Sequence, residues 1–479
     1  MTMRGETMWV SNYNIYIPLQ DDIHYLLVHG YTGAVDLVDT ELAQALQNCF
    51  SMHSDISVLA LPSTTLQLLE RRGYLTELSP EEEIAFVGRL ARKVHAFECE
   101  RTVFWIIPSY ACQLRCKYCF ERPVQNKGER EGWLSQKMSH KQVVAVFSAI
   151  RKLQGENTIR QITLYGGEPL LPGNREIIED IVSHGTYLGY RFMVFTNGVD
   201  VNIYADMLGP DRIEKLHVTL DGPQVIHDQL RVYANGGGTF ERITENIELA
   251  LNRGVKVLVR VNLTWDVLGH LDELAEYVQE RGWDSSPEFQ MYCQAIHSNQ
   301  QYQSCISPCS FQRIQPYLDG ILDIKQLGCI DNTKVARYLY EAGLDEIFLP
   351  DLQTSSIAKA LLTGKPSSVL KASSCYSHRG WYIFDPFGNI YCCSRLAGKP
   401  HYRIGVFVPQ LSLNENEKYW RERTVCTVST CQKCRYALYC RGGCAQQALV
   451  RTGDLYSPYC DNFPKRFKAT MIAHYRRGR

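Results

Sequence analysis

The 479-residue sequence has no apolar run approaching the roughly 18–20 residues that span a lipid bilayer. Its first six residues also lack the apolar core of a secretory signal. An excess of either charge is missing as well, because 51 Lys and Arg residues balance 51 Asp and Glu residues. That balance argues against a nucleic-acid binder that relies on neutralising phosphates. We therefore expect a cytoplasmic protein with neither a membrane nor a nucleic acid among its partners.

Cysteine is the abundant residue, and its 18 copies are clustered along the chain. Three lie within residues 112–119 and nine within residues 375–460. A reducing cytosol keeps thiols unpaired, so clustered cysteines predict metal ligands there. The alternative is a secreted disulfide scaffold, which suits small chains and requires a signal peptide.

Residues 102 to about 296 alternate between apolar strands and amphipathic helices. Continuous apolar strands are typical of a parallel sheet that helices cover. The fold class predicted is therefore α/β, with a partial (β/α)6 barrel of the TIM type. The expected strands are Val103–Ile107, Ile162–Tyr165, Phe192–Phe195, Leu216–Leu220, Val257–Val261 and Phe289–Tyr292, and the expected helices include Ser139–Leu153, Arg175–His184, Phe240–Asn252 and Leu271–Arg281.

Four consecutive domains follow from these patterns. Residues 1–98 form a small α+β module, residues 99–296 the barrel, residues 297–371 a bridge, and residues 372–479 a cysteine-rich domain organised by metal. In the module, Ser79 opens a capping box and Gly73 ends a helix. The other elements expected are the strands Tyr13–Leu19, His24–His29 and Ala34–Val38, and the bridge helices Phe311–Leu327 and Asn332–Ala342.

The first cysteine cluster has the spacing CxxxCxxC and follows the first barrel strand directly. Barrels carry their chemistry on the loops after the strands, so this position suits an active site. Three thiolates, from Cys112, Cys116 and Cys119, can ligate only three irons of a [4Fe–4S] cluster, which would leave the fourth iron open. A zinc site with a distant fourth ligand is the alternative.

The next strand ends in Gly166-Gly167-Glu168-Pro169. Paired glycines let the backbone approach a ligand closely, and the adjacent carboxylate can accept from an ammonium group. The CxxxCxxC motif with Tyr118 before its last cysteine, followed by this loop, resembles the radical S-adenosylmethionine (SAM) superfamily. The resemblance implies that SAM chelates the open iron, is cleaved reductively, and yields a 5′-deoxyadenosyl radical that abstracts hydrogen from a substrate.

The same resemblance assigns SAM contacts. Tyr118 and the Gly166–Glu168 loop would bind SAM, with Glu168 at its amino group, and Asn197 and Arg260 would help to hold its ribose and carboxylate. Later loops, at Thr219–Pro223, His227–Arg231 and Asn235–Phe240, are similar in succession to those of radical SAM enzymes that modify peptides and proteins.

The second cysteine cluster contains a run with the spacing CxxCxxxxxCxxxC, from Cys431 to Cys444, with Cys375 and Cys393 before it and Cys460 after it. This pattern resembles the seven-cysteine pattern of SPASM domains, which hold auxiliary [4Fe–4S] clusters. A pair of zinc knuckles is the alternative. One predicted set lacks a fourth ligand, which Cys392, Cys426, water or the substrate could supply. By the resemblance, the complete set is Cys431, Cys434, Cys440 and Cys460, and the incomplete set is Cys375, Cys393 and Cys444.

Two further features bear on the substrate. Anaerobic sulfatase maturases share this layout but typically have an aspartate directly after the cysteine at position 393, where this chain has Ser394. The N-terminal module weakly resembles the peptide-binding modules of maturases that act on ribosomally made peptides, which capture a leader segment as an added strand. The alternative is a module that only covers the side of the barrel.

These observations predict a radical SAM enzyme that modifies a precursor peptide and receives electrons from a flavodoxin or ferredoxin. A formylglycine-generating sulfatase maturase is the second hypothesis, and a non-catalytic iron–sulfur electron carrier is the third. The remaining cysteines are expected to be ordinary thiols, namely Cys49, Cys99, Cys293 and Cys329, with Cys305 and Cys309 as a structural pair.

Overall fold

The computed structural model describes residues 8–477 except 20, 22, 53–55, 57, 58, 60, 297–306, 318–329 and 331. The chain divides into two compact units. The cysteine-rich unit comprises Met1–Cys99, Gln353–Arg379 and Trp420–Arg479, and the sheet unit comprises Glu100–Leu352 and Gly380–Tyr419. The predicted domain boundaries at residues 98, 296 and 371 stay a prediction.

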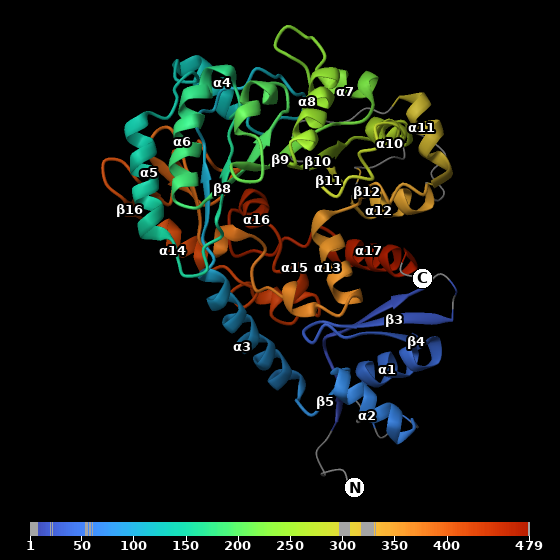
Figure 1. Cartoon of the computed structure of the whole chain (residues 1–479). Coiled ribbons are helices and arrows are strands. Elements are labelled where there is room, and N and C mark those ends of the chain that lie inside the picture. The colour runs from blue at the N-terminus through green and yellow to red at the C-terminus, as the bar shows by residue number, and fades with distance from the viewer. Residues whose placement is uncertain are drawn as a thin grey trace. The chain divides into compact units, whose positions relative to one another are not determined.

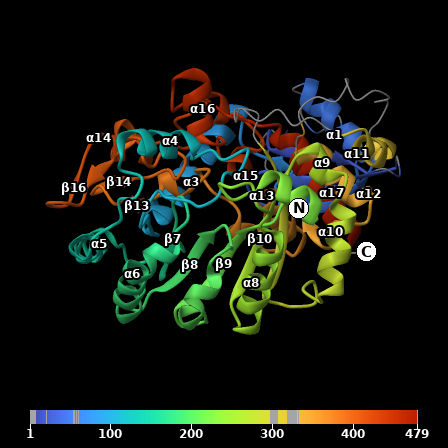
Figure 2. The same cartoon turned by 90° about the horizontal axis from the view of Figure 1, so that it is seen from above.

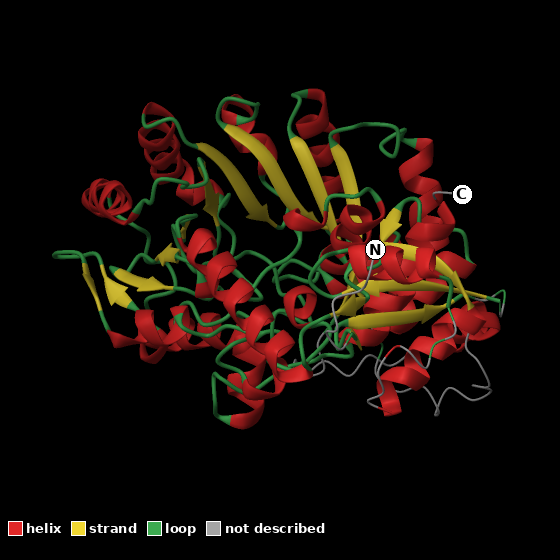
Figure 3. Ribbon diagram, turned by 90° about the horizontal axis from the view of Figure 1, so that it is seen from below, coloured by secondary structure: helices red, strands yellow, loops and turns green. Residues whose placement is uncertain are grey.

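The predicted parallel strands are confirmed in the sheet unit. They lie next to one another in sequence order, each pairing in parallel with the next, and Figure 3 shows the strands side by side. This arrangement places every connecting loop that follows a strand at one edge of the sheet. The strands are β6 (Val103–Ile106), β7 (Gln161–Leu164), β8 (Arg191–Thr196), β9 (Ile213–Thr219), β10 (Lys256–Leu263) and β11 (Phe289–Ala295).

Amphipathic helices lie on the outer side of these strands, as Figure 2 shows for four of them. Ser139 begins the first with a complete capping box, in which its hydroxyl and the Gln142 side chain each satisfy the other's backbone N–H. The apolar faces of the helices are buried, which confirms the α/β class. The four are α5 (His140–Leu153), α6 (Arg175–Tyr187), α8 (Phe240–Asn252) and α10 (Leu271–Glu280).

The sheet extends further than the sequence predicts. β12 (Phe348–Leu349) adds in parallel to β11, and β13 (Trp381–Phe384) adds in parallel to β6. β13 lies in the segment expected to be organised by metal. Its pairing with a strand almost 280 residues earlier is non-local, and a four-residue apolar run does not specify its partner. Three short antiparallel strands, β14 (Asn389–Tyr391), β15 (Gly405–Val406) and β16 (Ser412–Leu413), follow it.

In the cysteine-rich unit, the predicted N-terminal strands form an antiparallel sheet in the order β2 (Asn14–Pro18), β3 (His24–His29) and β4 (Val35–Asp39). A short pair, β1 (Trp9–Val10) and β5 (Leu75–Thr76), accompanies it. Three helices follow the strands, and Figure 1 shows this segment in blue. They are α1 (Thr40–Met52), α2 (Ser63–Arg72) and α3 (Pro80–Cys99), with Gly73 capping α2 at φ 91° and the Ser79–Glu82 capping box opening α3.

The core of this unit joins both ends of the chain. Ile15 and Ile17 of β2 and Leu26 of β3 pack with two later helices, α13 (Leu352–Leu362) and α17 (Phe463–Arg477). The Tyr439 hydroxyl also donates to the backbone oxygen of His29 at 2.7 Å. The N-terminal strands therefore share one hydrophobic core with the cysteine-rich segment.

The bridge region contains α11 (Pro308–Ile314) and α12 (Asn332–Glu341). The predicted helix Asn332–Ala342 is confirmed. The other predicted helix begins earlier, at Pro308, where Ser307 accepts from the Ser310 N–H as a cap. Its later part, from residue 318, lies outside the described residues. A search of the described chain finds no helix that is both long and apolar enough to cross a membrane.

Leu216 gives a direct test of the sheet core, because it is fully buried on β9 between two parallel neighbours. We expect Leu216→Ala to lower the free energy of unfolding by about 2–5 kcal/mol, from lost burial and the cavity left behind. The control is Val144→Ala on α5, whose side chain is 53% exposed. Anaerobic denaturant titration would contradict the assignment if both variants unfolded at the same concentration.

Candidate active site

The CxxxCxxC motif lies on the loop between β6 and α4 (Arg122–Glu131). Backbone N–H groups of this loop donate to the chain that follows β9: Arg115 to Val232 at 2.8 Å and Lys117 to Leu230 at 3.1 Å. An isolated bridge also pairs Leu114 with Tyr233. The loop is therefore held by strand-like contacts rather than by its own secondary structure.

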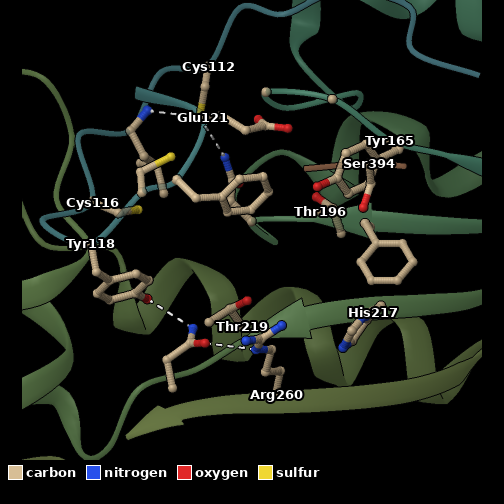
Figure 4. Close-up of a pocket in the computed structure, with 18 of the residues that line it drawn as sticks. Cys112, Cys116, Tyr118, Glu121, Tyr165, Thr196, His217, Thr219, Arg260 and Ser394 are labelled. Carbon is tan, nitrogen blue, oxygen red and sulfur yellow. Dashed lines mark hydrogen bonds between the residues drawn. The ribbon is translucent and has the colours of Figure 1, made fainter. Parts of the chain in front are cut away.

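Cys112, Cys116 and Cys119 line one cavity of about 270 Å³ in the sheet unit. Across the described residues, no three His, Cys, Asp or Glu side chains meet closely enough to enclose a single metal ion, and the three thiols share a cavity wall instead. Figure 4 shows Cys112 and Cys116 on this wall. The other lining residues include Trp105, Tyr118, Glu121, Tyr165, Gly166, Gly167, Phe195, Asn197, His217, Arg231, Arg260, Asn262, Ser394 and Arg395.

Burial raises the pKa of all three thiols, that of Cys119 to about 12, and the rise at Cys112 and Cys119 is increased by the neighbouring thiols. The thiolate form that binds metal is thus disfavoured until a positive charge arrives. A ferric or ferrous iron at each sulfur supplies such a charge. The donor set, three soft sulfurs facing an open cavity, fits a [4Fe–4S] cluster with one free iron.

Tyr118 is the centre of a buried network behind the cysteines. Its hydroxyl contacts the carboxylate of Asp221 and accepts from Arg231 at 3.0 Å and from the Asn262 amide at 3.2 Å. The Asn262 backbone N–H also donates to Asp221 at 2.7 Å. Arg231 lowers the pKa of Cys116, against the larger rise from burial. The predicted SAM contact of Tyr118 stays a prediction, whereas its hydroxyl clearly fixes the cysteine loop to β9 and β10.

The polar loops after β9 complete this network. The Asp221 backbone N–H donates to Nδ1 of His227 at 3.0 Å, and Nε2 of His227 faces the Thr239 hydroxyl at 3.0 Å. Thr239 in turn donates to the backbone oxygen of Arg231 at 2.8 Å. The residues noted in sequence at 227–231 and 235–240 therefore position Asp221 and Arg231.

The loop after β7 lies against the cysteine loop. A Cβ added at Gly166, whose φ is 134°, would lie 2.5 Å from the Ser109 oxygen, and one at Gly167 would lie 2.3 Å from the Tyr110 oxygen. Only glycine fits so close to another backbone. The Glu168 N–H then donates to the Ala111 oxygen at 2.8 Å. The paired glycines bring the two loops together at the cavity.

Glu168 lies behind the cavity wall, with 1% of its surface exposed. Its carboxylate accepts from the Leu170 N–H at 2.8 Å, the Thr196 hydroxyl at 2.8 Å and the Asn197 N–H at 2.6 Å. Burial raises its pKa to about 7. The predicted contact with the SAM amino group stays a prediction, and the structure adds a second role, which is to hold the loop after β8.

Asn197 and Arg260, the other predicted SAM contacts, both line the cavity. The Asn197 amide donates to Gln113 at 3.1 Å, and Nε of Arg260 donates to Asn262 at 2.7 Å. The structure thus brings every predicted residue of the first site to one place, with Glu168 supporting the wall from behind.

The opposite wall carries a polar group of which sequence analysis noted only Ser394 and missed Glu121 and Tyr165. Tyr165 lies close to both Glu121 and Ser394, and Figure 4 shows Tyr165 beside Ser394. Burial raises the pKa of Glu121 to about 8. Ser394 enters the cavity because β13 extends the sheet beside β6. The position of Glu121, two residues after Cys119, could have drawn attention to it in the sequence. The sequence could not show that its side chain lines the cavity.

Of the second cysteine cluster, Cys431, Cys434, Cys440 and Cys460 are mutual neighbours in the cysteine-rich unit. Burial raises the pKa of Cys431 to about 11 and that of Cys440 to about 12, and the other thiols of the set raise both further. Cys393 belongs to the sheet unit. The assignment of all seven cysteines to auxiliary clusters stays a prediction.

The remaining thiols differ in their surroundings. Cys426 donates to the backbone oxygen of Gly88 on α3 at 3.4 Å and lies near Arg92, so it faces that helix. Cys392 is buried. Cys49 and Cys293 are also buried, Cys99 is partly buried and Cys309 is exposed, whereas Cys305 and Cys329 lie outside the described residues.

Comparison with known families identifies the centre of the chain. The family model of the radical SAM superfamily matches residues 106–279, from β6 through most of α10. The chain contains a radical SAM domain. It is therefore a radical SAM enzyme, and the cofactors that this superfamily implies are SAM and one [4Fe–4S] cluster.

Two relatives of this radical SAM enzyme align with different shares of its length. The cysteine-type anaerobic sulfatase-maturating enzyme of Clostridium novyi is 22% identical over 372 residues, covering 75% of this chain and 92% of the relative. A probable GTP 3′,8-cyclase of Archaeoglobus fulgidus is 29% identical over 171 residues, covering 35% of this chain and 51% of the relative. The solved structure of native anSMEcpe with bound AdoMet has a TM-score of 0.56 and 17% identity, and covers 78% of this chain and 97% of that one. It confirms the fold.

Glu168→Gln tests how the radical SAM site holds the Asn197 loop. The amide keeps one acceptor oxygen but presents an N–H group to donors, so at least one hydrogen bond to a charged group, worth about 1.5–3 kcal/mol, is lost. We expect the dissociation constant for SAM to rise about tenfold. Anaerobic equilibrium dialysis with radiolabelled SAM measures it.

The matched control is Glu176→Gln on the exposed start of α6. Unchanged SAM affinity in a folded Glu168→Gln variant would show that the loop holds its position without this carboxylate.

Proposed function

We propose that this radical SAM enzyme modifies a residue of a ribosomally made precursor peptide. The observation that carries the proposal is the cavity itself. Its one wall holds three thiols fit for a cluster with an open iron, and its other wall holds aromatic and polar side chains that can receive a substrate residue. With SAM bound, the cofactors supply the 5′-deoxyadenosyl radical that abstracts a hydrogen atom from that residue.

The chain's own residues bind and orient SAM and the substrate. Asn197 and Arg260 contact SAM, and the Tyr118 network keeps the cysteine loop in register with β9 and β10. Trp105, with its ring centroid 4.8 Å from that of Tyr165 and 5.1 Å from that of Phe195, forms an apolar floor that excludes water. Glu121 and Tyr165 lie where they can hydrogen-bond the substrate.

Two observations favour a peptide substrate over a small molecule. The Clostridium novyi relative, aligned over 75% of this chain, is a sulfatase-maturating enzyme, so its substrate is a polypeptide. The N-terminal sheet also offers a place for an added strand, since β4 pairs only with β3 among the described strands. A cavity beside β4 is lined by Val35, Leu37 and Leu361, which can receive side chains of a leader segment.

The cysteine-rich segment is proposed to hold two auxiliary [4Fe–4S] clusters. One uses Cys431, Cys434, Cys440 and Cys460, and the other uses Cys375, Cys393 and Cys444. Bound at these cysteines, such clusters could take up an electron from a substrate radical, which a zinc ion could not. The electron that starts each reaction is proposed to come from a flavodoxin or ferredoxin.

A formylglycine-generating activity is the second candidate, favoured by the sulfatase-maturating relatives. Ser394 counts against it. This residue lines the cavity and directly follows Cys393. The sulfatase maturases that this chain resembles typically carry an aspartate there, which can act as a base and remove a proton. The serine is no base of comparable strength.

The decisive experiment is anaerobic reconstitution with iron, sulfide and SAM, followed by incubation with short peptides encoded beside the gene. We expect 5′-deoxyadenosine after reduction with dithionite, and a peptide lighter by two hydrogens for a crosslink or by more for an excision, both read by mass spectrometry. Cys112→Ala is expected to abolish both products, because the cluster loses one of its three protein ligands.

A peptide from a sulfatase with a cysteine at the modified position separates the two candidates. Formylglycine in that peptide would favour the second. Reduced wild-type enzyme that releases no 5′-deoxyadenosine would instead favour the iron–sulfur electron carrier.

Leader capture by β4 is tested at Leu37. Two hydrogen bonds fix the β3–β4 pattern: the His29 N–H donates to the Ala34 oxygen at 2.9 Å, and the Thr40 N–H donates to the Ile23 oxygen at 3.0 Å. Residues that face the partner strand alternate with residues that face away, so the Leu37 N–H points away from β3. Leu37→Pro therefore removes an outward donor and leaves the β3–β4 ladder intact. We expect leader affinity to fall about tenfold, from one lost hydrogen bond and a fixed φ.

Fluorescence anisotropy with a labelled leader and the full-length enzyme measures this affinity. Leu37→Ala keeps the N–H and is the control for loss of the side chain. Equal affinities for the proline and alanine variants would discard strand addition at β4 in favour of a module that only covers the barrel.

A further inference from the structure

Arg423 is a fully buried arginine in the cysteine-rich unit, with no exposed surface. Its guanidinium makes four hydrogen bonds, and every acceptor is a backbone oxygen. Nε donates to Leu455 at 2.6 Å, Nη1 to Gly443 at 3.1 Å, and Nη2 to Gly442 at 2.9 Å and Ser457 at 3.0 Å. The planar fork of arginine matches such a set, and lysine does not.

These acceptors belong to the two segments that carry predicted cluster ligands. Gly442 and Gly443 form the link between Cys440 and Cys444. Leu455 and Ser457 lead to Cys460. The two segments also touch directly, because the Tyr459 N–H donates to the Gly442 oxygen at 3.3 Å. A Cβ at Gly443 would lie 1.7 Å from the Tyr459 oxygen, so glycine is required at this crossing.

The charge of Arg423 is not matched by a carboxylate among its hydrogen-bond partners in the described chain. The ionisable groups that act most on it are thiols, those of Cys375, Cys431, Cys444 and Cys440. Burying a cation without a countercharge is costly. A [4Fe–4S] cluster with four thiolates carries a net negative charge. A cluster bound at these cysteines would therefore supply the negative countercharge that the carbonyl oxygens lack.

We infer that Arg423 is a positioning residue for the auxiliary clusters, which ties the segment of Cys440 and Cys444 to that of Cys460 and raises the reduction potential of the clusters through its buried charge. The inference rests on the proposed auxiliary clusters. A fixed positive charge stabilises the reduced, more negative form of a cluster. The clusters are then easier to reduce, which suits an acceptor of electrons from a substrate radical.

The test uses the full chain with Cys112, Cys116 and Cys119 replaced by alanine, so that any remaining cluster signal is auxiliary. Arg423→Gln removes the charge, and Arg423→Lys keeps it with fewer hydrogen bonds. Arg451→Gln removes a positive charge from the exposed face of the nearby helix α16 (Ala445–Thr452), where water screens it. Iron and sulfide content and an EPR-monitored redox titration are measured for each.

We expect the potential to become more negative in Arg423→Gln and to stay near the parent value in Arg423→Lys and Arg451→Gln. An unchanged potential in an iron-loaded Arg423→Gln variant, or an equal drop in Arg423→Lys, would overturn the role of the charge. A triple-alanine parent that binds no iron would refute the auxiliary clusters themselves, which is a separate result.

Thermal unfolding decides the matter if Arg423→Gln takes up little iron. If the charge of Arg423 balances that of the clusters, Arg423→Gln lowers the melting temperature more in cluster-loaded protein than in cluster-free protein. An equal drop in both forms would leave Arg423 as a structural clamp only and would overturn the inference.

Discussion

The close approach of two loops after neighbouring parallel strands is the constraint on which the active site depends. Gly166 and Gly167 allow the loop after β7 to lie against the backbone of residues 109–111, immediately before Cys112. The N–H of Glu168 then donates to the Ala111 oxygen, and its carboxylate holds the next loop at Asn197. Each loop thus fixes the one beside it, so the cavity wall is built along the sheet edge in strand order.

The Tyr118 network supplies the second support of the same wall. Asp221, Arg231 and Asn262 come from three different segments after β9 and on β10, and all three contact the Tyr118 hydroxyl. Because these groups are buried and paired, each would be costly to leave without its partners. The cysteine loop is therefore held rigidly although it has little regular secondary structure. The proposed role of this loop, to present three sulfurs to one cluster, requires such rigidity.

Arginines adjoin both sets of cysteines. Arg231 acts on Cys116, and Arg423 acts on four thiols of the cysteine-rich unit. Arg231 lies near the Asp221 carboxylate, since both contact the Tyr118 hydroxyl, whereas the hydrogen bonds of Arg423 end on carbonyl oxygens. A cation beside a carboxylate changes the local charge less than a cation without one, so the two sites are expected to differ in how far the protein shifts the potential of a bound cluster.

The sequence by itself determined the α/β class, the six parallel strands β6 to β11, and the candidate residues of the first cysteine site, because apolar periodicity and the spacing of Cys112, Cys116 and Cys119 are local. It also marked the loops at 227–231 and 235–240 as similar to those of radical SAM enzymes that modify peptides, without their structural role. Only the tertiary structure decided that Glu168 supports Asn197, that Tyr118 meets Asp221, and that Ser394 enters the cavity through the pairing of β13 with β6. These are contacts between residues from about 30 to nearly 300 positions apart, and no local pattern specifies which distant partner a buried polar group will find.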